Sequence, residues 1–118
     1  MAEHNLLGKK GEEKAVEFLK KLGYEIVATN WLEQKFEIDI IAKDGNEFVF
    51  VEVKTRSTDF FGTPEEAVTP AKQNHLIEGA DFYIQQHEID LEARFDVIAI
   101  VLNKQNITIN HFKAAFYP

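Results

Sequence analysis

The chain has 118 residues, of which 45% are hydrophobic and 28% are charged. This length and balance are typical of a globular protein, so we expect one domain over residues 1–118 and exclude wholesale disorder and a coiled coil. The absence of cysteine excludes disulfide scaffolds, cysteine zinc sites and thiol nucleophiles, and it fits a cytoplasmic protein. The formal net charge of −7 argues against binding of nucleic acid through bulk positive charge.

Hydropathy along the chain predicts no membrane partner. The longest uninterrupted apolar run, Val97–Leu102, has six residues, whereas a spanning helix needs about 20. The first residues carry an acid and no apolar core, so we expect no secretory signal.

The first predicted elements are a helix and a short strand. Over residues 10–22 apolar side chains, with Leu22 the last of them, recur at steps of three and four, and Gly23 provides a C-terminal stop. Residues 24–29 predict a strand that follows directly.

Two further strands are expected to form a hairpin. Residues 36–42 and 47–54 are rich in β-branched and aromatic residues, and Asp44-Gly45-Asn46 between them is a strong turn signal. We therefore expect these two strands to pair in an antiparallel manner.

The second half of the chain predicts a connection, a helix and two strands. Residues 55–69 form the connection, and Thr69-Pro70 then begins a helix with Thr69 as its N-cap. Strands are expected over residues 94–102 and 106–112. The resulting order α-β-β-β-α-β-β predicts an α/β protein in which helices flank a central mixed sheet.

The stretch Phe48–Lys54 carries the strongest functional signal. Its apolar residues occupy both alternating positions, which is typical of a central strand covered on both faces, and Glu52 interrupts this pattern. A carboxylate in such a strand is costly unless it is paired or binds a metal. We therefore interpret Glu52 as a functional residue.

The register of the hairpin determines what Glu52 faces. If a tight turn is centred between positions 45 and 46, paired positions sum to 91. The pairs that this register brings together are Asp39 with Glu52, Glu37 with Lys54, and Ile41 with Phe50. Because side chains alternate along a strand, this register predicts three carboxylates and one ammonium in a single patch.

Opposed carboxylates repel unless a cation lies between them, and the predicted patch has one ammonium for three acids. A Mg²⁺ or Mn²⁺ ion bound by Asp39 and Glu52 would offset the repulsion between these carboxylates, with Glu37 as a further acid of the metal site. Such a metal polarises a phosphodiester and activates water, and Lys54 would stabilise the developing charge or orient the water. Glu12 shares the apolar stripe of the first helix, so we expect it to face the sheet as a fourth acid.

The order and spacing of these motifs resemble the YraN-like uncharacterised proteins. The motifs are Gly11-Glu12, Glu37-Ile-Asp39, Glu52-Val-Lys54-Thr-Arg56, the run from Gly62 to Lys72, and Arg94-Phe-Asp96. This family is similar to archaeal Holliday-junction resolvases and to the PD-(D/E)XK superfamily. The resemblance implies a restriction-endonuclease-like core and a metal-dependent nuclease acting on branched or single-stranded DNA. It also implies that Asp39 is the motif aspartate, Glu52 and Lys54 the E-x-K half, and Glu12 the helix acid.

Two basic residues are candidate contacts to nucleic acid, namely Arg56 after the motif and Lys72 in the second helix. The alternative for each is a solvated surface residue, and the acidic chain predicts weak, salt-sensitive DNA binding confined to one face. We interpret Asp96 as structural, and Phe60 and Phe61 as anchors onto the core. Two other classes of function stay open: a catalytically silent nuclease-fold accessory module, and a protein-interaction domain that forms a homodimer, as resolvase-like relatives do.

Overall fold

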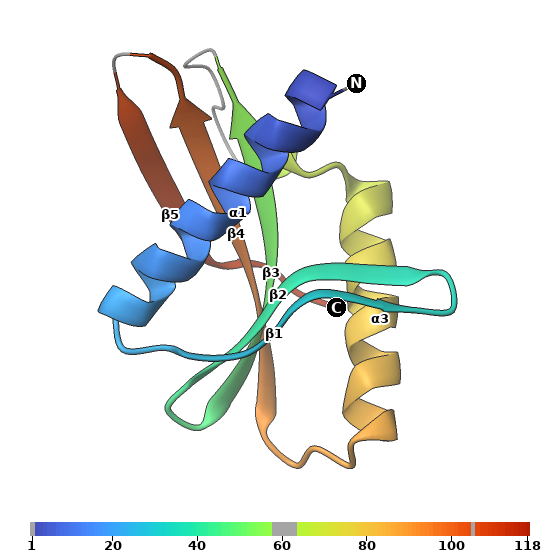
Figure 1. Ribbon diagram of the computed structural model, residues 1–118. Coiled ribbons are helices and arrows are strands. Elements are labelled where there is room, and N and C mark those ends of the chain that lie inside the picture. Colours follow the sequence, from blue (N-terminus) through green and yellow to red (C-terminus); the bar gives the residue numbers. More distant parts are fainter. Residues whose placement is uncertain (1, 58–63, 105) are drawn as a thin grey trace.

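The structure is a computed structural model in which the backbone is described for residues 2–57, 64–104 and 106–118, and side chains for residues 6–57, 66–104 and 106–118. The elements in chain order are α1 (Ala2–Lys21), β1 (Glu25–Glu33), β2 (Phe36–Asp44), β3 (Glu47–Arg56), α2 (Pro64–Ala67), α3 (Pro70–Gln86), β4 (Glu92–Leu102) and β5 (Ile107–Phe116) (Figure 1). The predicted order is confirmed, with the short helix α2 added in the connection. Phe60 and Phe61 lie outside the described residues, so their interpretation as anchors stays a prediction.

The five strands form one mixed sheet in the order β1-β2-β3-β4-β5. Strands β3 and β4 are parallel, and all other neighbours are antiparallel. The central strand β3 is covered on both faces, with Val49, Phe50 and Val51 fully buried. The prediction of a central mixed sheet flanked by helices is therefore confirmed, and none of the described helices is long and apolar enough to cross a membrane.

Each face of the sheet has its own hydrophobic cluster. On one face Ala15 and Leu19 of α1 pack with Ile40 and Val51. On the other face α3 contributes its buried side chains to a cluster that contains Ile41 and Phe50, and α2 contributes Ala67. The expectation that Leu22 joins the α1 stripe is wrong, because α1 ends at Lys21 and the Leu22 side chain is 51% exposed.

Helix α1 approaches β3 most closely at Gly11. A Cβ atom at this position would overlap the side chain of Thr55, so a larger residue would push the helix away from the sheet. The absence of a side chain at Gly11 therefore sets the distance between α1 and β3, and it determines how near the following residue, Glu12, comes to the sheet.

The β1–β2 hairpin changes face near its middle. Ile38 and Ile41 pack in the same cluster, on the α3 side, although they are three positions apart, and Ile40 packs on the α1 side. On β1, Asn30 has a φ of 51°, a left-handed conformation that asparagine tolerates better than most residues. The expectation that strict alternation places Glu37, Asp39 and Ile41 on one face is therefore wrong. The far end of the hairpin extends across α3 in Figure 1.

A buried polar network joins β4 to its surroundings around Asp96, which is fully buried. Asp96 accepts hydrogen bonds from Arg94 and from the backbone N–H of Ala114, and its Oδ2 lies 2.7 Å from Nε2 of His111. Burial alone would raise the pKa of Asp96, but these partners lower it below its ordinary value. The Arg94 Nη1 atom also donates to Asp44 and Glu47 at 2.9 and 3.0 Å, which ties the β2–β3 turn to β4. The structural interpretation of Asp96 is thus supported by its bonds.

Candidate functional site

The β2–β3 hairpin opens at Asp39. Its ladder runs from the Asp44–Glu47 pair to the Ile40–Val51 pair, which confirms the predicted register. Beyond that point the backbone N–H of Val53 donates to Oδ2 of Asp39 at 2.8 Å. A side-chain oxygen therefore takes the place of a strand carbonyl, and this bond fixes the Asp39 carboxyl group between the separating strands.

Glu52 lies beside Asp39, as the register predicts. The Glu52 side chain is almost completely buried, and its carboxyl group is within hydrogen-bonding reach of the Asp39 carboxyl group. Burial, and then the charge of Asp39, raises the pKa of Glu52 to about 8. Burial also raises the pKa of Asp39. At neutral pH the pair therefore holds a proton, which a cation with oxygen affinity can replace.

Two lysines compensate part of the charge of this pair. Lys72, in the first turn of α3, places its Nζ atom 3.8 Å from Oε2 of Glu52. Thr69 caps this turn by accepting a hydrogen bond from the Lys72 backbone N–H, which confirms the predicted N-cap. The Lys54 charge also favours the ionised form of Glu52. Lys72, predicted as a phosphate contact, is thus brought into the carboxylate site, whereas Arg56 is exposed at the end of β3.

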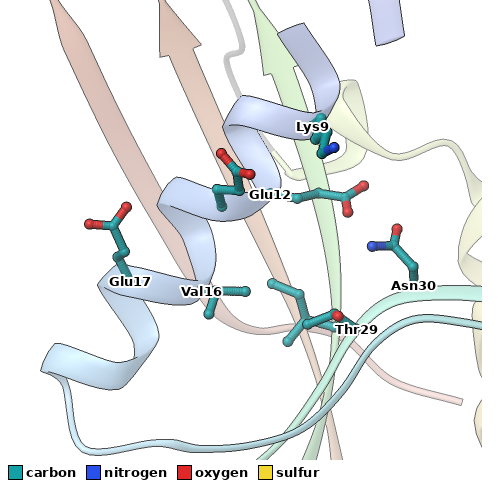
Figure 2. Close-up of a pocket in the computed structure, with 8 residues that line it drawn as sticks. Lys9, Glu12, Val16, Glu17, Thr29 and Asn30 are labelled. Atoms are coloured by element: carbon teal, nitrogen blue, oxygen red, sulfur yellow. The ribbon is translucent and has the colours of Figure 1, made fainter. Parts of the chain in front are cut away.

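Glu12 reaches the same site from α1. Its carboxylate is within hydrogen-bonding reach of the Asn30 amide, and Figure 2 shows the two side chains pointing toward each other. Both side chains line a pocket of about 520 Å³. Burial, followed by the charges of Asp39 and Glu37, raises the pKa of Glu12. The expectation that Glu12 faces the sheet is confirmed.

Asn30 is a site residue that the sequence analysis missed. The predicted strand ended at position 29, and a single asparagine in an extended segment gives no functional signal. Its left-handed backbone could have been suspected only from the tolerance of asparagine for this conformation.

Glu37 is less closely joined to the site than expected. Its side chain is exposed, and its expected pairing with Lys54 is not part of the β2–β3 ladder. The Glu37 charge nevertheless raises the pKa values of Glu12, Asp39 and Glu52, so all four predicted acids lie in one electrostatic neighbourhood.

The donor set of this site fits a hard divalent cation held by two protein carboxylates. Among the side chains that the structure describes, no three or more histidine, aspartate or glutamate residues are arranged to hold a metal ion together. Mg²⁺, however, commonly binds through one or two carboxylates and completes its shell with water and phosphate oxygens. The Asp39–Glu52 pair offers oxygen ligands of this kind. The direct involvement of Glu12 and Glu37 as ligands stays a prediction.

Comparison with known proteins shows relatives of nearly the same length. The family model described as "Uncharacterised protein family UPF0102" matches residues 11–100. A UPF0102 protein of Flavobacterium psychrophilum is 52% identical over 99% of this chain and 98% of its own length. A UPF0102 protein of Christiangramia forsetii is 50% identical over the same shares, and one of Caldicellulosiruptor saccharolyticus is 50% identical over 93% of this chain and 96% of its own length.

Proposed function

We propose that this chain, which belongs to the uncharacterised protein family UPF0102, is a divalent-metal-dependent nuclease that acts on DNA. The proposal is inferred from the site. In this proposal Asp39 and Glu52 bind Mg²⁺ or Mn²⁺, and a DNA phosphodiester is hydrolysed beside them. The fold that we propose for this activity is the restriction-endonuclease-like core implied by the motif resemblance.

The observation that carries the proposal is the Asp39–Glu52 pair, in which Glu52 is buried and Asp39 is half-buried. Two carboxyl groups that share a proton inside a protein reduce its stability, and perturbed acids of this kind cluster at functional sites. Among the described side chains, Lys72 lies 3.8 Å from Glu52 and is itself 43% exposed, so it neutralises the pair only in part. By contrast, the other buried acid, Asp96, is satisfied by Arg94 and by hydrogen bonds, as a structural residue should be.

Each residue has a distinct role in the proposed reaction. A bound Mg²⁺ supplies a Lewis acid and an activated water. Asp39 is held in place by the Val53 N–H, and Glu52, whose pKa is raised in the metal-free chain, would give up its proton when it binds the metal. The ammonium groups of Lys54 and Lys72 stabilise negative charge that develops on the phosphate.

The substrate must approach with little help from overall charge. The net charge of −7 opposes DNA binding, so we propose that contact is confined to the face that carries Lys54, Arg56 and Lys72. Binding by so few cations should be weak and should fall steeply as salt rises.

The test combines metal binding with cleavage. Purified protein is incubated with linear, flapped and four-way DNA in the presence of Mn²⁺, beside Glu52→Ala and the matched control Glu78→Ala, which changes an exposed acid of α3. We expect cleavage by the wild type and the control only. Equal cleavage by Glu52→Ala would refute the proposal, because a contaminating nuclease acts equally in every sample.

A catalytically silent module is the second candidate function, and the absence of a three-carboxylate group among the described side chains favours it. Calorimetry discriminates the two. If neither Mg²⁺ nor Mn²⁺ binds to the wild type, alone or with DNA, the site does not work as a nuclease centre. Light scattering over a concentration series tests the homodimer in the same preparation.

A further inference from the structure

A pocket on the α1 side adjoins the proposed nuclease site but is not explained by it. Its volume of about 520 Å³ lies in the range of small-molecule sites and far exceeds the space that one metal ion needs. Glu12 belongs to both places: its carboxylate lines the pocket, and the charge of Asp39 raises its pKa. A ligand that contacts Glu12 would therefore lie within electrostatic range of Asp39, where the nuclease proposal places the phosphate.

The charges of the pocket disfavour an anionic ligand. Glu12, Glu13 and Glu17 line it from α1, and Lys9 is the cation among the lining residues. The Glu17 side chain points away from Asn30 (Figure 2) and pairs with Lys14 at 3.9 Å, which leaves Glu12 and Glu13 against Lys9. A phosphate group would be repelled by this excess of carboxylates, whereas a neutral group with N–H donors would be attracted.

The hydrogen-bonding groups of the pocket are mostly acceptors. The Asn30 amide N–H is directed at the Glu12 carboxylate, which leaves the Asn30 carbonyl oxygen and a second Glu12 oxygen as acceptors. Val16 contributes an apolar surface to the same pocket. This combination suits a flat ring with apolar faces and adjacent N–H donors on one edge.

We propose that this pocket binds the guanine base of the nucleotide next to the cleaved phosphate, with Glu12 and Asn30 reading its Watson–Crick edge. The inference rests on the proposed function for the position of that phosphate. Guanine presents N1–H and N2–H side by side, which matches a carboxylate. Adenine and cytosine place an acceptor nitrogen beside their amino group, and thymine has a single N–H between two carbonyls, so each would direct a lone pair at Glu12.

This assignment restricts the substrate. The Watson–Crick edge of a base is accessible only when the base is unpaired, so the pocket can be filled by single-stranded DNA, a flap or an unpaired base at a junction, but not by an intact duplex. The pocket thereby gives a structural reason for a preference for unpaired DNA, with guanine beside the cut.

The first test uses nucleosides, which carry no phosphate and need no metal. We titrate guanosine, adenosine, cytidine and thymidine into the full chain and follow binding by NMR. Guanosine should bind at least about tenfold more tightly than the others, the discrimination expected of a matched two-bond contact. Equal binding of guanosine and thymidine, or no saturable binding of guanosine, would overturn the inference.

Two substitutions place the binding in this pocket. Asn30→Gly removes the amide at a position where glycine tolerates the φ of 51°, and Gln34→Gly is the matched control, since Gln34 has a φ of 55° at the exposed far end of the same hairpin. We expect about a tenfold loss of guanosine affinity for Asn30→Gly and none for Gln34→Gly. Val16→Phe narrows the pocket without removing a polar group, and it should weaken guanosine binding as well. Unchanged affinity in both pocket variants would contradict the proposal.

A last comparison separates failure of this inference from failure of the nuclease proposal. Glu52→Gln should lose Mn²⁺-dependent cleavage and keep guanosine binding. Cleavage by the wild type without preference for an unpaired guanine refutes the pocket assignment alone. If the wild type binds guanosine but neither binds metal nor cleaves DNA, the nuclease proposal is refuted, and so is the placement of the base beside a cut. The guanine site itself is then upheld.

Discussion

Replacement of Glu52 by glutamine should make the protein more stable at neutral and alkaline pH. In the folded chain, burial and the neighbouring Asp39 raise the pKa of Glu52 from its ordinary 4.5 to about 8. Between these two values the unfolded chain releases the proton and the folded chain keeps it, so stability falls as pH rises. Glutamine cannot ionise, and it retains the size of the side chain, so Glu52→Gln escapes this loss.

The expected loss of stability follows from the size of the pKa shift of Glu52. Each pKa unit corresponds to about 1.4 kcal/mol, so the wild type should lose on the order of 3 kcal/mol between pH 4.5 and pH 7, and about 5 kcal/mol above pH 8. Asp39, whose pKa is also raised by burial, contributes with the same sign. The advantage of Glu52→Gln should therefore be near zero at pH 4 and largest at pH 8.

Urea unfolding followed by circular dichroism at pH 4, 6 and 8 measures this difference. Glu78→Gln serves as the control, because it makes the same substitution at an exposed position on α3 and should follow the wild type at every pH. If the wild type and Glu52→Gln lose or gain stability in parallel across this range, Glu52 is not held protonated and the reasoning about the carboxylate pair is wrong.

Three further predictions concern other parts of the fold. Gly11→Ala should cost about 1–3 kcal/mol in thermal or urea unfolding because the new methyl group meets Thr55, whereas Gly8→Ala, with open space around it, should be neutral or slightly stabilising. Asp96→Asn should destabilise the fold by about 3–5 kcal/mol because it leaves Arg94 without its buried partner. Since the pKa of Asp96 is lowered, the stability that this carboxylate gives the wild type is present above pH 3.8 and is lost as pH falls below it. A variant whose stability has the same acid dependence as the wild type would contradict this. Lys72→Met should weaken DNA binding, and it should reduce the slope of log affinity against log salt concentration by about one. Fluorescence anisotropy measures both, with Lys20→Met in the last turn of α1 as the control. An unchanged slope would show that Lys72 does not contact DNA.

Local signals in the sequence were sufficient to predict the order of elements and the β2–β3 register. The Asp44-Gly45-Asn46 turn fixes the register, and Glu52 stands out because a carboxylate interrupts an apolar central strand. Thr69 and Gly23 likewise mark helix ends through capping rules that act over a few residues. These features depend on neighbours along the chain, and they were therefore accessible without the fold.

The features that escaped prediction depend on contacts between distant segments. The change of face at Ile38 occurs where Asn30 on the paired strand has a left-handed φ, and strict alternation cannot anticipate it. The contact of Lys72 with Glu52 requires the position of α3 relative to β3, and the approach of Glu12 to Asn30 requires the packing of α1 on the sheet. The four predicted acids were found near one another, but their division between an inner pair and two outer residues was not predictable.

The bond from the Val53 N–H to Asp39 has a consequence for the motions of the chain. Most amides of a sheet are shielded from exchange with solvent by a neighbouring strand, but this amide is shielded by a side chain that also faces the proposed cation site. Any ligand that draws the Asp39 carboxylate toward itself must loosen that shield. The hydrogen-exchange rate of a single main-chain amide in β3 would then report whether the site is occupied, without the need for a substrate or a turnover assay.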